Sequence, residues 1–92
     1  MFILVSYDIP VDKRRNKIAQ ILEDYGTRVQ YSVFECDLSA RQIDKLIKEL
    51  TEVMNEAEDS LRLYRLCADC VKTIKALGQA EPPQPTPDVF IV

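Results

Sequence analysis

The chain has 92 residues, of which 47% are hydrophobic and 29% are charged, with a net charge of −3. This composition is typical of one small globular domain and excludes a disordered chain. No apolar run approaches the roughly 20 residues that span a bilayer, and the first residues lack the basic start of a signal peptide, so we expect a cytoplasmic protein without membrane segments. A domain this small buries a modest core, which favours dimerisation.

The charges are unevenly distributed along the chain. Residues 35–60 contain three Lys/Arg against eight Asp/Glu, whereas residues 1–34 contain five against four. A basic cluster lies in the first part: Lys13, Arg14, Arg15 and Lys17. Because local potential rather than net charge attracts phosphates, the acidic total weakens a nucleic-acid-binding interpretation without removing it.

The first predicted elements are a strand and a helix. Residues 2–9 form a largely apolar run, typical of a strand buried on both faces, and Pro10 ends it. Apolar residues then recur at helical spacing, which predicts a helix over residues 12–25. Asp12 is the candidate N-cap of this helix, and Gly26 is the candidate C′ residue that stops it.

A second β region and a second helix follow. Residues 28–36 mostly alternate and are rich in β formers, which predicts one long strand or two strands joined by a bulge. Ser39 and Gln42 form a capping box, with serine at the N-cap and glutamine at N3. An amphipathic helix to about residue 56 follows, with these apolar positions: Ile43, Leu46, Ile47, Leu50 and Val53.

The last part of the chain predicts a strand over residues 60–67 and then a short strand or helical turn over 71–77. The segment 82–87 is proline-rich and should be extended and stiff. A terminal apolar strand over 88–92 should be paired, because an exposed edge of this kind promotes aggregation, and we expect it to pair with a partner protomer rather than with its own sheet.

The order of elements is βαββαβ with an additional terminal strand. This order predicts an α+β, ferredoxin-like fold, with an antiparallel sheet and two helices on one face. We therefore expect a domain over residues 1–78 and a proline-rich arm with a C-terminal strand over residues 79–92.

The three cysteines are too few, and odd in number, for a disulfide framework. Cys67 and Cys70 form a CxxC motif. Because the chain has no histidine, a zinc site would need Cys36 and a further ligand, from a carboxylate or a partner chain. A redox pair usually opens a helix after a strand, which this position allows. The simplest interpretation is two ordinary thiols near a strand end.

Asp8 is a carboxylate at the end of an otherwise apolar strand. An ionised group there is costly unless it is hydrogen-bonded, paired or bound to a metal. Oxygen ligands suit Mg²⁺ or Mn²⁺, and two Asp8 carboxylates across a dimer axis would make a better site than one. Such a metal can activate water and stabilise charge on a phosphodiester. The alternative is that Asp8 caps the following turn.

Other candidate residues are few. Tyr7 and Phe34 can stack on bases, although aromatic residues in strands are more often part of the core. Four basic side chains can contact phosphate, although each by itself is more simply a solvated charge: Arg14, Arg15, Lys17 and Arg28. The absence of histidine excludes a histidine general base, and the chain has no Walker, HExxH or GxSxG motif.

Three motifs taken together resemble a known family. They are Val5 to Ile9 (VSYDI), Asp12 to Lys17 (DKRRNK) and Tyr25 to Cys36 (YGTRVQYSVFEC). In order and spacing they are similar to the small CRISPR-associated endonuclease family, the compact subunit that accompanies the CRISPR integrase in spacer acquisition. The resemblance covers about residues 1–70, and the C-terminal arm looks like the variable tail of the family.

The resemblance implies a ferredoxin-like homodimer in which Asp8 is the metal-binding aspartate, with Mg²⁺ or Mn²⁺ as the cofactor. Four further residues fall on positions linked with nuclease activity in some members: Tyr7, Arg15, Arg28 and Phe34. Nucleic acid would contact the basic residues: Lys13, Arg14, Arg15, Lys17 and Arg28. Lys17 stands where arginine occurs in other members, which keeps the charge and loses the bidentate fork.

The resemblance leaves two functions open. One is a metal-dependent endonuclease that cleaves single-stranded RNA or double-stranded DNA during antiviral spacer acquisition. The alternative is a non-catalytic dimeric scaffold that bridges integrase dimers and binds DNA. A third class, a toxin-like RNA interferase, shares the ferredoxin-like fold, but assigning that function would rest on analogy of fold alone.

Overall fold

A four-stranded antiparallel sheet forms the centre of the computed structural model, which describes residues 1–83. The expected strand over residues 88–92 lies outside the described residues and stays a prediction. The elements follow in the order β1 (Phe2–Asp8), α1 (Asp12–Glu23), β2 (Thr27–Gln30), β3 (Val33–Asp37), α2 (Ala40–Val53), β4 (Ser60–Leu66) and α3 (Ala68–Lys72). The strand order β2-β3-β1-β4 confirms the predicted ferredoxin-like arrangement.

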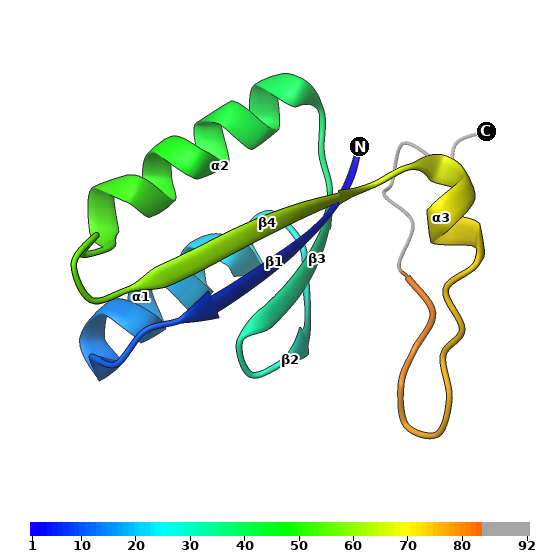
Figure 1. The fold of residues 1–92 in the computed structure, drawn as a ribbon, viewed down its shortest axis with the longest axis horizontal. Coiled ribbons are helices and arrows are strands. Elements are labelled where there is room, and N and C mark those ends of the chain that lie inside the picture. Colours follow the sequence, from blue (N-terminus) through cyan, green and yellow to red (C-terminus); the bar gives the residue numbers. More distant parts are fainter. Residues whose placement is uncertain (84–92) are drawn as a thin grey trace.

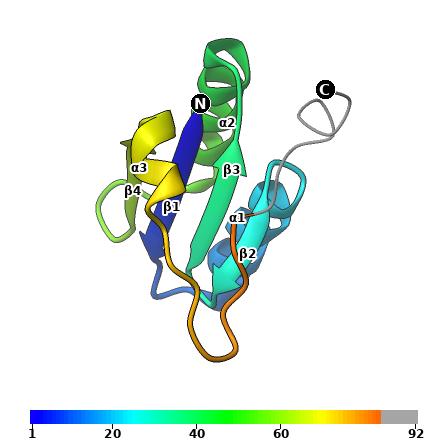
Figure 2. The ribbon, with the colours of Figure 1, turned by 90° about the vertical axis from the view of Figure 1, so that its right-hand side faces the viewer.

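The two faces of this sheet have different neighbours. Helices α1 and α2 cover one face, called here the helix face (Figure 1). The largest fully buried side chains lie between these helices and the sheet: Val5, Ile18, Leu22, Phe34, Cys36 and Leu46. On the opposite side, called here the open face, α3 and the segment after it lie in front of part of the sheet (Figure 2). Residues 74–82 line a hollow there with β2 and Glu35, and burial raises the pKa of Glu35.

Residues 27–37 form a hairpin rather than one long strand. Residues Tyr31 and Ser32 form a turn between β2 and β3, so the prediction of two strands is confirmed, but a turn rather than the predicted bulge joins them. The pairing of the two strands also shifts between Arg28 and Gln30. The turn lacks the usual Asn-Gly signal. It is held instead by Tyr7, whose backbone N–H donates to the Ser32 carbonyl at 3.0 Å and whose hydroxyl donates to the Tyr31 carbonyl at 2.9 Å.

The predicted ends of α1 are wrong in two respects. Val11 is the N-cap, and Asp12 is the first helical residue, where its carboxylate accepts a hydrogen bond from Arg15. Gly26 does not have a positive φ, and within residues 1–83 only Gly78 does. Glycine is needed at position 26 for space, because an added Cβ would lie 2.2 Å from the Glu35 carbonyl oxygen. Gly26 is therefore required because it lies close to β3, and not because of the predicted C′ role.

Helix α2 begins as predicted, with the capping box of Ser39 and Gln42. It ends at Val53, before the predicted residue 56. The reason is tertiary: the buried Asp59 carboxylate accepts the backbone N–H of Asn55 at 2.8 Å, which turns the chain toward β4. Three apolar positions of α2 are buried as predicted: Ile43, Leu46 and Leu50.

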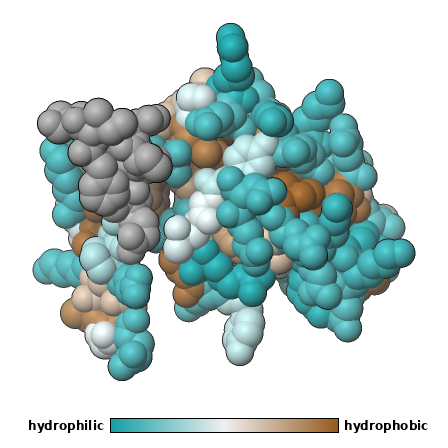
Figure 3. Space-filling model, turned by 180° about the vertical axis from the view of Figure 1, so that it is seen from behind, coloured by the Kyte–Doolittle hydropathy of each residue, from teal (hydrophilic) through white to brown (hydrophobic). Residues whose placement is uncertain are grey.

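The chain after β4 is helical earlier than predicted. Cys67 is the N-cap of the short helix α3, so the helical alternative predicted for 71–77 is the correct one, but the helix begins at Ala68 and ends at Lys72. Within the part of the chain that the structure describes, no helix is long and apolar enough to cross a membrane. Seen from behind, most of the surface is hydrophilic, with hydrophobic side chains in small separate areas (Figure 3).

Candidate active site at the end of strand β1

Asp8 is the last residue of β1 and is exposed on the open face of the sheet. Side chains alternate between faces along a strand, and Val5 and Tyr7 are buried on the helix face, so Ser6 and Asp8 point to the other side. The next residue, Ile9, is buried in the core. Asp8 is therefore held between a central strand and an anchored turn, with its carboxylate accessible.

An open hollow of about 240 Å³ surrounds this carboxylate. It is lined by Ser6, Tyr7, Asp8, Ser60 and Arg62. Ser60 lies opposite Asp8 and Arg62 lies opposite Ser6 in the β1–β4 pairing. The hollow therefore combines one acidic and one basic side chain with two hydroxyl groups.

Ser60 and Arg62 were not predicted as site residues. Their signal in the sequence is the shared parity of Ser60, Arg62 and Tyr64, which places three polar-tipped residues on one face of a strand. Only the pairing of β4 with β1 brings that face beside Asp8.

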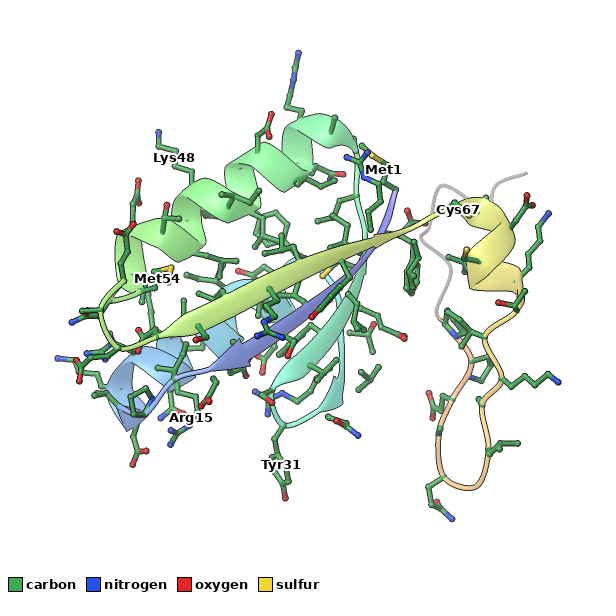
Figure 4. The ribbon with its side chains drawn as sticks, in the orientation of Figure 1. Met1, Arg15, Tyr31, Lys48, Met54 and Cys67 are labelled. Atoms are coloured by element: carbon green, nitrogen blue, oxygen red, sulfur yellow. The ribbon has the colours of Figure 1, made fainter. Side chains whose placement is uncertain are left out.

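Arg15 braces the turn that follows Asp8. Its guanidinium donates to the Ile9 carbonyl at 2.8 Å and also contacts the Asp12 carboxylate. These contacts join the start of α1 to the end of β1, where Arg15 lies in Figure 4. Arg15 therefore holds the turn next to Asp8 in place, and its side chain remains 40% exposed.

Arg14 makes a bidentate ion pair rather than facing solvent freely. Its Nε and Nη2 donate to the two Asp59 carboxylate oxygens at 2.8 and 3.0 Å, and Nη2 also lies 3.3 Å from Glu58. The hydrogen bonds from Arg14 hold the pKa of Asp59 below its usual range. Since Asp59 directly precedes Ser60, this pair fixes the start of β4 beside Asp8.

Tyr7, Phe34 and Arg28 form a row across three strands, with both rings on the helix face, although Tyr7 also contributes to the lining of the hollow. The rings of Tyr7 and Phe34 stack with centroids 6.3 Å apart, and they are 4% and 0% exposed. The Arg28 guanidinium carbon lies 5.2 Å from the centroid of Phe34, within the range of a cation–π contact. Both rings belong to the core and have no free face for a base in this conformation.

The structure thus does not gather the predicted site residues into one cluster. The Asp8 carboxylate is on the open face, the rings of Tyr7 and Phe34 are on the helix face, and Arg28 is at the β2 edge. Lys13 and Lys17 are exposed on α1 and form no ion pair within residues 1–83.

The oxygen donors at Asp8 fit a hard divalent cation in part. One carboxylate and the hydroxyls of Ser6 and Ser60 are the donor types that Mg²⁺ prefers, and Mg²⁺ often keeps several waters beside one or two carboxylates. Residues 1–83 contain no group of three or more His, Cys, Asp or Glu that could hold a metal ion. A single chain therefore offers only part of the ligands that such an ion needs.

Comparisons with known proteins identify the family of this chain. The family model described as CRISPR associated protein Cas2 matches residues 1–74. CRISPR-associated endoribonuclease Cas2 1 of Chloroflexus aurantiacus is 48% identical over 93 residues, which cover 100% of both chains. CRISPR-associated endoribonuclease Cas2 3 of Synechocystis is 47% identical over 97% of this chain and 95% of its own length.

Solved structures give the same result. A hypothetical protein from Thermus thermophilus superposes with a TM-score of 0.79 at 37% identity, over 90% of this chain and 96% of its own. Cas2 of Streptococcus pyogenes has a TM-score of 0.75 at 35% identity, over 85% and 100%. A chain of a partial Cas6-RT-Cas1–Cas2 complex has a TM-score of 0.75 at 29% identity, over 94% and 93%. The chain therefore belongs to the Cas2 family of CRISPR-associated proteins.

Proposed function

We propose that this protein is a nuclease of CRISPR spacer acquisition that cleaves phosphodiester bonds of RNA or DNA at Asp8. Relatives that match over nearly the whole chain are named endoribonucleases, and another that covers 85% of it is named an endonuclease. The observation that carries the proposal is the accessible Asp8 carboxylate beside Arg62 in an open hollow. A carboxylate and a guanidinium are the two groups needed there, one to hold a metal and the other to contact a phosphate.

Asp8 would hold Mg²⁺ or Mn²⁺ together with the hydroxyls of Ser6 and Ser60. When bound, such a metal lowers the pKa of a coordinated water and neutralises charge on the phosphate. The chain's own contribution is position. Asp8 comes from a rigid central strand, and Arg62 on β4 can bind phosphate oxygens through its planar fork.

A homodimer would complete the site. One chain supplies one carboxylate, and a two-fold axis close to the open faces would bring a second Asp8 to the same ion. Exposed Lys13 and Lys17 on α1 would contact the nucleic-acid backbone outside the hollow. Arg14, Arg15 and Arg28 are proposed to act there through position rather than as free phosphate ligands, because each already has a close partner within the chain. Arg62 makes a longer contact of 3.5 Å with the Tyr64 hydroxyl, which a phosphate can replace.

The proposed partner is the Cas1-type integrase of the same system, in the cytoplasm. It is supported by the similarity to a chain in a complex named Cas6-RT-Cas1–Cas2. Co-purification with the integrase from the same organism, before and after removal of residues 84–92, tests this assignment. Absence of co-purification for the full chain would contradict it.

The decisive experiment compares Asp8→Asn with the parent on single-stranded RNA and double-stranded DNA, with Mg²⁺ and with EDTA. Loss of a metal-binding carboxylate should lower cleavage at least about 100-fold. Asp44→Asn, at an exposed aspartate on α2, is the matched control and should cleave as the parent does. Equal cleavage by the Asp8 variant would overturn the assignment. Integrase binding without cleavage by the parent would favour the non-catalytic scaffold instead.

The role of Arg62 is tested in the same assay. Arg62→Lys keeps the charge and loses the bidentate fork, so cleavage should fall about tenfold, and Arg62→Ala should lower it further. Light scattering of each variant reports whether the homodimer is retained. Normal cleavage by the Arg62→Ala variant would show that Arg62 has no role in the proposed site.

A further inference from the structure

The CxxC motif lies where the chain leaves the sheet. Cys67 is the N-cap of α3, directly after β4, and is seen at the junction of the two elements in Figure 4. The Sγ atoms of Cys67 and Cys70 are 3.2 Å apart, and the Cys70 backbone N–H donates to the Cys67 sulfur at 3.4 Å. Both cysteines are exposed. The two thiols therefore meet each other and also meet solvent.

The third cysteine provides an internal contrast. Cys36 is 1% exposed within the core, and burial raises the pKa of its thiol to about 11. The side-chain hydrogen bond between the two sulfurs lowers the pKa of Cys67 and raises the pKa of Cys70. This asymmetry is typical of a pair in which one thiolate attacks and the other resolves, because the thiolate is the nucleophile.

A metal role for the pair is less well supported. Two thiolates make half of a tetrahedral zinc shell. Residues 1–83 contain no group of three or more ligating side chains around Cys67 and Cys70 that could complete it. The neighbour of each sulfur is the other sulfur, which is the arrangement needed to form a bond between them.

We propose that Cys67 and Cys70 form a reversible disulfide within the chain, by exchange with small disulfides of the glutathione class. The Cys67 thiolate attacks one sulfur of the small disulfide, whose S–S bond breaks and releases one thiolate. The Cys70 thiol loses its proton to water, and the resulting thiolate attacks the Cys67 sulfur of the mixed disulfide, whose S–S bond breaks and releases the second small thiolate. Two protein thiols are oxidised by two electrons in total, and one small disulfide is reduced to two thiols.

This pair is separate from the proposed nuclease site. Leu66, which precedes Cys67, pairs with Phe2 at the opposite end of β1 from Asp8, about 20 Å away at the usual rise of a strand. The disulfide would instead fix the first turn of α3, where the segment that crosses the open face begins. The inference therefore does not depend on the proposed nuclease activity.

The test uses the full chain, reduced, freed of reductant, and then incubated with oxidised glutathione before an acid quench. The intact mass should fall by two hydrogen atoms, and reduction with dithiothreitol should reverse the change. Cys70→Ser should instead accumulate one glutathione on Cys67. At neutral pH, alkylation of Cys67 should be at least about 100-fold faster than that of Cys36, because the thiolate fraction follows the pKa.

Cys67→Ser is the matched control. Both exposed positions tolerate serine, so folding of the variants can be checked by circular dichroism without disturbing the core. Persistence of three free thiols in the parent would overturn the proposal. A disulfide that still forms in Cys67→Ser, or a doubled mass from a bond between chains, would overturn it as well.

Discussion

Alternate residues of the same strands point to the helix face and to the open face of the sheet, yet the two faces differ in burial and in chemical character. On the helix face, Tyr7 and Phe34 are stacked and buried beneath α1 and α2. On the open face, Asp8 and Arg62 line an accessible hollow and make few contacts. Residues that the resemblance assigns to one site are therefore divided between the buried helix face and the accessible open face.

This difference separates two ways in which a residue can affect activity. If the proposed site at Asp8 is correct, a core ring such as Phe34 would affect it through the shape of the sheet that carries Asp8. A side chain in the hollow would affect the reacting groups directly. Loss of activity on mutation does not distinguish them, whereas the free energy of unfolding does. The following predictions use stability to test the division, from the largest expected effect to the smallest.

Phe34→Ala should have the largest effect. The side chain is fully buried, and its removal leaves a cavity between the sheet and the helices, so the free energy of unfolding should fall by about 3–5 kcal/mol. Urea unfolding measures the change. Tyr31→Ala is the aromatic control, since Tyr31 is 91% exposed and projects from the β2–β3 turn (Figure 4), and it should change stability by less than about 0.5 kcal/mol. Equal effects would contradict the division of the two faces.

Gly26→Ala should have the next largest effect. The added Cβ would overlap the Glu35 carbonyl and the Cys36 sulfur, and a shift of β3 should cost about 1–3 kcal/mol. Gly78→Ala meets no atom within 4 Å, but φ is +62° there, so strain of about 1 kcal/mol is expected. Thermal unfolding compares the two. A larger loss of stability for Gly78→Ala than for Gly26→Ala would contradict the expected order, because backbone strain at Gly78 would then cost more than the overlap at Gly26.

Arg14→Gln should change how stability depends on pH. The pair lowers the folded-state pKa of Asp59, so its stabilisation is present above the unfolded value of about 4 and is lost as pH falls through the lower folded value. The gap in melting temperature between parent and variant should therefore be widest near neutral pH and narrow below about pH 4. Arg41→Gln, at an exposed arginine on α2, is the control. A gap that stays constant with pH would exclude this linkage.

Asp8→Asn should have the smallest effect on stability. The carboxylate is exposed and makes no hydrogen bond to another side chain within residues 1–83, so the free energy of unfolding should change by less than about 0.5 kcal/mol. Urea unfolding of this variant beside the cleavage assay separates chemistry from folding. A large loss of stability would make Asp8 a capping residue of the turn instead.

Much of the fold was predictable because local patterns carried it. The apolar run of β1, the capping box at Ser39 and the apolar spacing of α2 depend on neighbours within one element. Strand β1 is nevertheless buried along its length only on the helix face, and not on both faces as predicted. The element ends were less predictable, since they depend on distant partners. Helix α2 ends early because Asp59 captures the Asn55 backbone, and Gly26 is required by the approach of β3.

From the sequence, Asp8 could be named as a candidate site residue, but the list of its neighbours in the hollow was incomplete. Asp8 was conspicuous as a charge in an apolar strand, a contrast visible without any structure. Arg62 was not, because its importance depends on β4 lying beside β1. Arg14 was expected to face phosphate, and the structure pairs it with Asp59, 45 positions away.

The sequence by itself determined the class of fold and the family, and it marked Asp8 as a candidate site residue, because short-range patterns and motif spacing are sufficient for each. Only the tertiary structure decided which face of the sheet each residue occupies, and therefore which neighbours it has. It placed Arg62 in the hollow, Tyr7 and Phe34 in the core, and the sulfurs of Cys67 and Cys70 within 3.2 Å of each other. The physical reason is that strand pairing and burial depend on contacts between distant segments, which no local pattern encodes.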